Sequence, residues 1–215
     1  MHEPPGGRRG LTSLSGNPDS QTIAEYYDVW AEDYEHDVAE WEYHAPEVVA
    51  ELLAREVPRD AKVLDAGCGT GLSGKALANA GFHDIQGFDI SERSLELAAG
   101  TGAYAGLARV DMQRLPLPSA NDVFGGLVCV GVLTYLHDTV GVLREFCRIV
   151  RPGGLVVLTQ RADLYLERDC ETAFRHLEAE GCWQRSAVSE ARPYLPANAE
   201  FGDAIGVIYG AYRVV

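Results

Sequence analysis

The chain has 215 residues and a formal net charge of −14, with 32 acidic and 18 basic residues. This length predicts one domain with a full hydrophobic core. An acidic surface repels the backbone of nucleic acids, which argues against a nucleic-acid partner. No charged start followed by an apolar run opens the chain, and its longest apolar run, residues 127–133, is too short to cross a bilayer. We therefore expect no membrane partner.

The cysteines indicate the compartment. Five of them are spread along the chain without a CxxC pair, and most stand in apolar patterns. Such cysteines are typical of reduced thiols in a core, not of disulfides or a metal centre. The sequence therefore predicts a cytoplasmic protein without a metal site.

The first part of the chain divides into a tail and two helices. Residues 1–18 are rich in Gly and Pro and poor in apolar residues, which predicts a disordered tail. Asp19 then begins a helix in which apolar and aromatic residues recur at steps of three and four: Ile23, Tyr26, Tyr27, Trp30, Ala31 and Tyr34. Pro46 suits the first turn of a second helix. We expect residues 19–58 to form a helical segment ahead of the main domain, residues 59–215.

A glycine-rich loop follows. The apolar segment 61–64 leads into Asp-Ala-Gly-Cys-Gly-Thr-Gly at 65–71, and residues 72–80 have a helical pattern. Strand, glycine turn and helix in this order are typical of a nucleotide site, because the turn allows close approach of a ligand and the helix start offers free amides. A second strand ends at Asp89, at the spacing where a carboxylate holds a ribose diol.

Two other ligand classes compete for the same loop. Residues 69–74 satisfy GxGxxG, a weak indication of a nicotinamide or flavin enzyme. Residues 69–75 also match the start of a phosphate-binding loop, but Ala76 stands where that loop needs a Ser or Thr hydroxyl. An oxidoreductase also needs a proton donor, and the Tyr-x-x-x-Lys pattern is absent because Lys62 and Lys75 are the only lysines.

The remaining segments alternate between strands and helices. Ser91 is a suitable N-cap for the next helix, and a third strand, 104–110, is closed by Asp111 and Met112. The nearly continuous apolar segment 126–131, which includes Val130, predicts a strand buried on both faces. Further elements are expected in this order: a helix at 139–150, a strand at 155–159, a helix at 169–181, and two antiparallel strands at 183–188 and 205–214.

Several of these segments carry a family resemblance. Residues 63–71 and 87–91 closely resemble the first two motifs of class I S-adenosylmethionine-dependent methyltransferases, and the Arg-Pro-Gly-Gly turn at 151–154 is a further match. Residues 26–34 look like the N-terminal lid helix of small-molecule members. The chain departs from the family at Gly125, where an Asp usually stands. Within the small-molecule type, the chain is most similar to the Williams-Beuren syndrome region methyltransferase-like group.

The resemblance implies a fold, a cofactor and a reaction. The fold would be α/β, a Rossmann-like, seven-stranded, mostly parallel sheet with helices on both faces, an antiparallel last strand and an N-terminal helical lid. The cofactor would be S-adenosylmethionine, with S-adenosylhomocysteine as the product. The methyl group would pass by in-line displacement to an O, N or S atom of a small molecule, with catalysis by alignment of the reactants and exclusion of water.

The resemblance also implies site residues. Asp89 would hold the ribose and Asp111 the adenine amino group, and the full set of cofactor-binding candidates is Tyr26, Tyr34, Asp65, Gly67, Cys68, Gly69, Asp89, Ile90, Ser91, Asp111, Met112 and Val130. The substrate candidates are Tyr27, Tyr43, His44, Tyr135 and Arg161. No catalytic base is assigned, because an amine or thiolate acceptor needs none. An NAD(P)-dependent oxidoreductase and a non-catalytic S-adenosylmethionine-binding module remain the alternatives.

Overall fold

The structure is a computed structural model that describes residue 14 and residues 18–215. The expected disordered tail therefore lies almost entirely outside the described residues. The helices are α1 (Ser20–Glu40), α2 (Ala45–Glu56), α3 (Leu72–Asn79), α4 (Glu92–Gly100), the short 3₁₀ helix η2 (Leu133–Tyr135), α5 (Thr139–Ile149), α6 (Ala162–Glu167) and α7 (Cys170–Ala179). The strands are β1 (Val63–Ala66), β2 (Ile85–Asp89), β3 (Gly106–Arg109), β4 (Phe124–Cys129), β5 (Val150–Arg161), β6 (Trp183–Val188), β7 (Arg192–Leu195) and β8 (Gly202–Val214).

The strands form one mixed sheet in the order β3-β2-β1-β4-β5-β8-β6. β1 to β5 are parallel, and β8 lies antiparallel between β5 and β6. This confirms the predicted Rossmann-like fold with an antiparallel last strand. β7 is an additional short strand that pairs with the start of β8. The sequence did not predict it, because a four-residue strand that contains Pro193 carries little strand signal.

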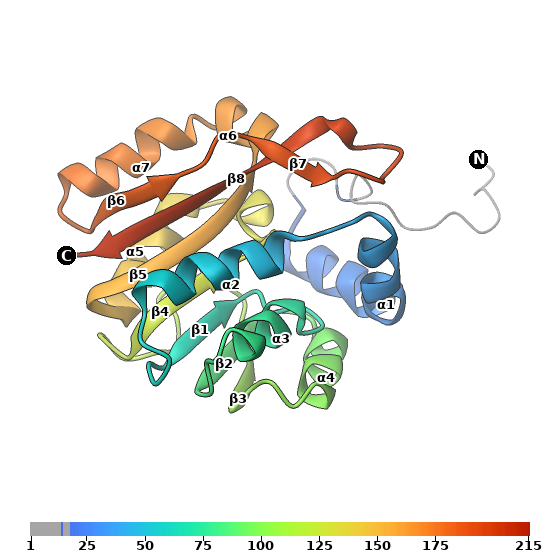
Figure 1. The fold of residues 1–215 in the computed structure, drawn as a ribbon, viewed down its shortest axis with the longest axis horizontal. Coiled ribbons are helices and arrows are strands. Elements are labelled where there is room, and N and C mark those ends of the chain that lie inside the picture. The colour runs from blue at the N-terminus through green and yellow to red at the C-terminus, as the bar shows by residue number, and fades with distance from the viewer. Residues whose placement is uncertain (1–13, 15–17) are drawn as a thin grey trace.

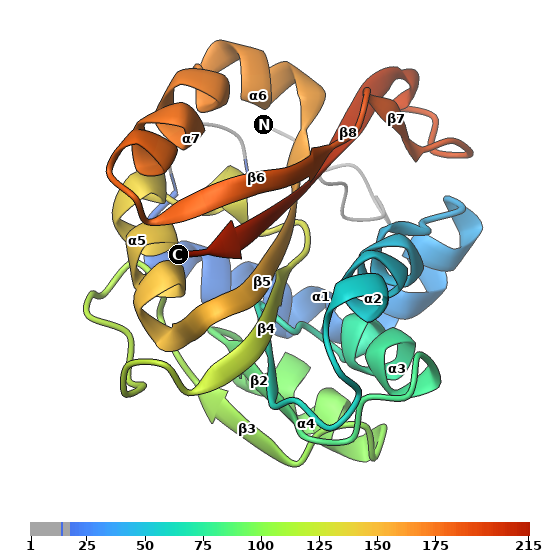
Figure 2. The ribbon, with the colours of Figure 1, turned by 60° about the vertical axis from the view of Figure 1, so that its left-hand side comes forward.

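Helices cover both faces of the sheet (Figures 1 and 2). Side chains alternate along each parallel strand, so that Leu64, Leu127 and Val156 belong to one apolar cluster and Val63, Val128 and Val157 to the other. The first cluster includes residues of α5 and α7, and the second includes residues of α2 and α3. Because both faces are covered, the central strands β1, β4 and β5 are mostly apolar where they cross the core.

Helix α1 lies beside the carboxyl ends of the parallel strands (Figure 1). Its N-cap is Asp19, whose side chain accepts a hydrogen bond from the Thr22 amide at 2.8 Å. The aromatic side of the helix packs in a third apolar cluster, which contains Trp30 together with Leu195 of β7 and Phe201 of the turn before β8. The N-terminal helix and the β7–β8 hairpin are thus joined across this edge of the sheet.

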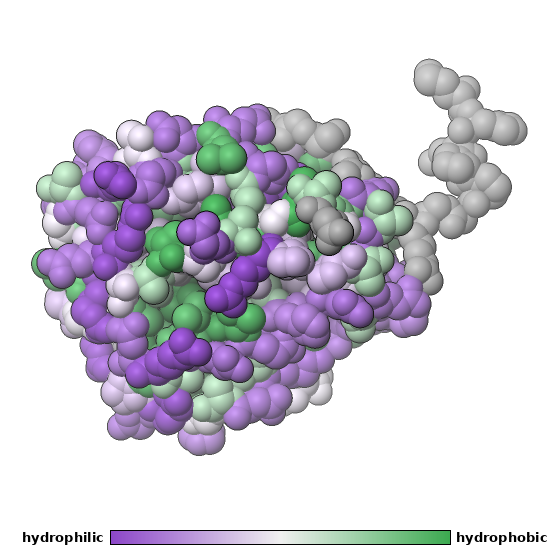
Figure 3. Space-filling model, turned by 45° about the horizontal axis from the view of Figure 1, so that its top comes forward, coloured by the Kyte–Doolittle hydropathy of each residue, from purple (hydrophilic) through white to green (hydrophobic). Residues whose placement is uncertain are grey.

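The face of the molecule in Figure 3 is mainly polar. Hydrophilic side chains cover most of the face seen in Figure 3, and apolar side chains form smaller patches between them. Within the part of the chain that the structure describes, no helix has both the length and the apolar character needed to cross a bilayer.

Candidate active site

A cavity lies at the carboxyl ends of the parallel strands, beneath α1 and the β7–β8 hairpin. It encloses about 1050 Å³ of empty space, part of it open to solvent. A ligand site at this edge is expected for an open, mostly parallel sheet. Most of the residues predicted from the sequence line this cavity: Tyr27, Tyr34, Tyr43, Gly67, Gly69, Asp89, Ile90, Asp111, Met112, Val130, Tyr135 and Arg161.

Five predicted residues do not line it. Tyr26 is buried in the cluster around Trp30, and His44 is exposed at the start of α2, where its side chain caps nothing. Ser91 is the buried N-cap of α4. Asp65 is fully buried, and Cys68 borders a smaller neighbouring hollow. Spacing along the chain placed these residues near the site but could not show which way each side chain points.

The structure also brings to the cavity residues that the sequence analysis did not assign to the site. They include Ile23, Thr70, Ser94, Gln113, Thr134, Tyr194 and Phe201. Ile23 could have been found, because it shares a helix face with Tyr27 and Tyr34. No sequence signal pointed to Tyr194 or Phe201, since both belong to the unpredicted hairpin.

The glycine loop is fixed by its backbone and by Asp89. Gly67 and Gly69 have φ values of +86° and +51°, in the left-handed region that favours glycine. A Cβ at Gly67 would lie 2.1 Å from Val132, whereas a Cβ at Gly69 would meet nothing within 4 Å. Asp89 accepts hydrogen bonds from the Gly69 amide at 2.8 Å and from the Ser91 amide at 2.9 Å. Burial raises the pKa of this carboxyl, and the two amide hydrogen bonds partly oppose that rise.

Asp65 supports the loop from behind. Its Oδ2 accepts a hydrogen bond from the Tyr104 hydroxyl at 2.7 Å, and that hydroxyl accepts one from the Gly74 amide at 3.0 Å. The other carboxyl oxygen, Oδ1, is buried without a hydrogen-bond partner among the described residues. Burial raises the pKa of Asp65 to about 7, although the Tyr104 hydrogen bond lowers it. Asp65 is thus tied to α3 through Tyr104 and does not face the cavity.

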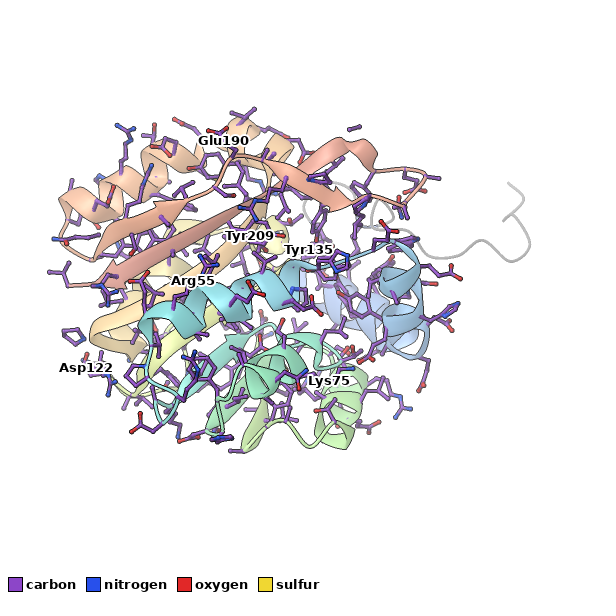
Figure 4. The ribbon with its side chains drawn as sticks, viewed as in Figure 1. Arg55, Lys75, Asp122, Tyr135, Glu190 and Tyr209 are labelled. Carbon is purple, nitrogen blue, oxygen red and sulfur yellow. The ribbon has the colours of Figure 1, made fainter. Side chains whose placement is uncertain are left out.

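Tyrosines line the other half of the cavity. They come from α1, the loop before α2, η2 and β7, and they are Tyr27, Tyr34, Tyr43, Tyr135 and Tyr194. Tyr27 donates a hydrogen bond to the Tyr135 hydroxyl at 3.0 Å, and Figure 4 shows Tyr135 on the side of the sheet where α1 lies. Burial raises the pKa of all five. These hydroxyls therefore stay protonated at neutral pH and act as hydrogen-bond donors or acceptors, not as bases.

Two of these tyrosines meet above the end of β4. The rings of Tyr43 and Tyr194 pack edge to face with centroids 5.6 Å apart. A Cβ at Gly131 would lie 3.5 Å from the Tyr194 hydroxyl oxygen and 3.6 Å from that of Tyr43. The backbone after β4, where Val130 also lines the cavity, therefore faces both hydroxyls.

Polar contacts hold α1 over the cavity. Asp28 accepts hydrogen bonds from the Ser91 hydroxyl at 2.6 Å and from the Arg93 amide at 3.1 Å, at the N-terminus of α4. Lys75 of α3 forms an ion pair with Glu35 at 2.7 Å, and Figure 4 shows Lys75 on the side of α3 toward α1. The roof of the cavity is thus attached to the elements that follow the glycine loop and β2.

Comparison with known proteins decides the family. A family model described as a methyltransferase domain matches residues 64–158. The chain is 33% identical over 183 residues to Methyltransferase-like protein 27 of Homo sapiens. The match covers 82% of this chain and 74% of that protein. The chain belongs to the class I S-adenosylmethionine-dependent methyltransferases. S-adenosylmethionine is therefore the cofactor of this methyltransferase, and the oxidoreductase and the non-catalytic module are set aside.

Two further similarities extend the comparison. This methyltransferase is 31% identical over 134 residues to the O-methyltransferase rstn1 of Aspergillus nomiae, and the match covers 58% of each chain. Its fold superposes on the crystal structure of the [4+2]-cyclase SpnF with a TM-score of 0.72 at 19% identity, over 92% of this chain and 97% of that chain. At that identity the second similarity describes the fold alone.

Proposed function

We propose that this methyltransferase transfers the methyl group of S-adenosylmethionine to an O, N or S atom of a small molecule held in the tyrosine-lined half of the cavity. The observation that carries the proposal is that one cavity is lined both by Gly67, Gly69 and Asp89 and by the tyrosine hydroxyls. An O-methyltransferase among the relatives supports a small-molecule acceptor. The similarity to the Williams-Beuren syndrome region group, the absence of nucleic-acid and membrane partners, and the cytoplasmic location stay predictions.

The half of the cavity near the glycine loop fits the cofactor. Space is open where a Cβ of Gly69 would project, so the backbone can approach a ligand closely. Each carboxylate oxygen of Asp89 accepts one amide hydrogen bond, and each has a further lone pair for a ribose hydroxyl. Asp111 lies beyond the end of β3 and lines the same half, with Ile90 and Met112 as apolar neighbours. We assign Asp111 to the adenine amino group.

The protein's contribution to the reaction is to position and enclose the reactants. When bound, S-adenosylmethionine supplies a methyl group already activated on a sulfonium. Tyr27 and Tyr34 on α1 and Tyr43 before α2 cover the reacting groups and exclude water, which favours direct displacement. Burial raises the pKa of the tyrosine hydroxyls, and a guanidinium is a hydrogen-bond donor only, so none of these groups removes a proton from the acceptor. The accepting atom then reacts without the help of a base from this half of the cavity.

Calorimetric titration with S-adenosylmethionine and S-adenosylhomocysteine tests the cofactor half, with NAD and ATP as controls. We expect micromolar binding of the first two only. Transfer of a labelled methyl group to a panel of small phenols, amines and thiols then tests the acceptor half. The Gly69→Val variant is the control, because its side chain enters the space proposed for the cofactor. Equal affinity for NAD, or unchanged cofactor binding in the control, would contradict the proposal.

A further inference from the structure

Arg161 offers unused hydrogen-bond donors to the cavity. It is the only basic residue that lines the cavity in the described part of this acidic chain. Its Nε and Nη2 donate to the two carboxylate oxygens of Asp163 at 3.1 and 2.6 Å, and its guanidinium lies 5.1 Å from the centre of the Phe201 ring. Nη1 has no hydrogen-bond partner among the described residues. One edge of the planar guanidinium is therefore fixed, and the opposite edge is free for a ligand.

Two tyrosine hydroxyls near Arg161 also have a proton to donate. Tyr135 accepts a hydrogen bond from the Tyr27 hydroxyl at 3.0 Å. Tyr194 lines the same cavity, and its ring packs edge to face against that of Tyr43. Neither Tyr135 nor Tyr194 donates its own proton to any acceptor in the described part of the chain. Tyr135, Tyr194 and Arg161 all line the same cavity, so a ligand there can meet all three side chains.

Donors without acceptors define the ligand chemistry here. A half-buried donor that lacks an acceptor costs free energy until a ligand supplies one. The acidic residues that line the cavity, Asp89 and Asp111, follow β2 and β3, whereas Arg161 ends β5 and Tyr135 ends η2. The tyrosine-lined half therefore presents an excess of donors and one positive charge, and a planar carboxylate matches the free edge of the guanidinium.

We propose that the acceptor is a small aromatic or apolar carboxylic acid whose carboxylate is bound by Arg161, Tyr135 and Tyr194. This rests on the proposed function, because it names the class of acceptor for the same cavity. The carboxylate serves as an anchor and is not the atom that accepts the methyl group, because three donors occupy its lone pairs and weaken it as a nucleophile. The aromatic rings around it supply the walls for an apolar body.

The test compares carboxylates with their uncharged amides. Benzoate, cinnamate and indole-3-acetate, each paired with its primary amide, are titrated into the full chain saturated with S-adenosylhomocysteine. We expect at least one carboxylate to bind about tenfold or more tightly than its amide, as for a charge-assisted hydrogen-bond pair. Arg161→Gln should remove this preference, and Tyr135→Phe and Tyr194→Phe should each reduce it several-fold. If no carboxylate of the panel is preferred in the natural chain, the proposal is wrong.

Matched variants separate this role from a structural one. Asp163→Asn releases the edge of Arg161 that Asp163 now holds and should strengthen carboxylate binding. Arg161→Gln should weaken it. If these substitutions acted only through a loss of packing, both variants would bind the carboxylate more weakly. Arg144→Gln on α5 removes an ion pair with Glu180, the C-cap of α7; it is the charge control and should leave carboxylate binding unchanged. S-adenosylhomocysteine affinity should be equal in the natural chain and in Arg161→Gln. A loss of S-adenosylhomocysteine affinity in Arg161→Gln would indicate that the guanidinium contacts the cofactor, and would overturn the proposal. If the natural chain does not bind S-adenosylhomocysteine, the proposed function itself is contradicted.

Discussion

Replacement of Asp65 by Asn should make the protein more stable at pH 8 relative to the natural chain. In the folded chain, burial raises the pKa of this carboxyl from its ordinary value of 3.8 to about 7. The folded chain therefore holds the Asp65 proton more tightly than the unfolded chain does. As pH rises from about 4 to about 8, this group lowers the free energy of unfolding, and above about pH 8 the loss is complete.

The size of the effect follows from the shift of the pKa. At about 1.4 kcal/mol for each pKa unit, a rise of about three units corresponds to a loss of about 4 kcal/mol over the whole window. Roughly 2.5 kcal/mol of this falls between pH 5 and pH 8, because the unfolded carboxyl is already mostly ionised at pH 5. Asn cannot ionise, so the stability of Asp65→Asn relative to the natural chain should rise by roughly 2.5 kcal/mol over that interval.

Urea unfolding of both proteins at pH 5, 6, 7 and 8 measures this difference. Asp33→Asn, at an exposed position of α1, removes one acidic group from the surface and controls for the change in net charge. Tyr104→Phe should have the opposite effect at pH 8, because it removes the one hydrogen bond that stabilises the buried carboxylate. A stability difference between Asp65→Asn and the natural chain that stays constant from pH 5 to pH 8 would refute the reasoning.

Three further substitutions test the site and its roof. Asp89→Ala should weaken S-adenosylhomocysteine binding about 10- to 100-fold in calorimetry, because it removes a charged acceptor and releases the Gly69 amide. Gly69→Val should reduce that affinity at least about 100-fold, since its side chain enters the cavity at a strained φ of +51°. Asp37→Ala should lower the free energy of unfolding by about 1–3 kcal/mol in urea, because it leaves the buried Trp30 indole N–H, now 2.8 Å from Asp37, without an acceptor.

Each of these substitutions has an outcome that would count against it. Near-normal affinity of Asp89→Ala for S-adenosylhomocysteine would show that this carboxylate does not bind the cofactor. If Gly69→Val binds the cofactor normally, the cofactor does not occupy the open space beside the glycine loop. For Asp37→Ala, an unchanged free energy of unfolding would mean that water accepts the hydrogen bond of the Trp30 indole N–H. Asp33→Asn is the control for the loss of one charge on the same helix.

Much of the cofactor half could be predicted from the sequence. The positive φ values of Gly67 and Gly69 are local properties of the loop, and an acid at the end of β2 is placed beside that loop by the pairing of adjacent parallel strands. Order along the chain was thus enough to bring Gly69 and Asp89 together. The surroundings of Asp65 could not be predicted in this way. The sequence places Asp65 near the end of β1, but it does not show that the Tyr104 hydroxyl, far along the chain, donates a hydrogen bond to it.

The tyrosine-lined half depended on contacts between distant segments. Tyr27 meets Tyr135, and Tyr43 meets Tyr194, only because α1, η2 and the β7–β8 hairpin pack around the same edge of the sheet. His44 shows the converse, because it stands next to Tyr43 in the chain and yet points to solvent. Neighbouring side chains on a turn diverge, so proximity in sequence does not decide which of them reaches the cavity.

The sequence by itself determined the fold, the family and the position of the glycine loop, because hydrophobic periodicity and glycine conformation are encoded in short segments. Only the tertiary structure decided which donors converge in the second half of the cavity. Asp163 holds one edge of the Arg161 guanidinium and leaves Nη1 free, and Tyr27 donates to the Tyr135 hydroxyl and leaves the Tyr135 proton free. Such pairings depend on packing between elements, which no short segment specifies.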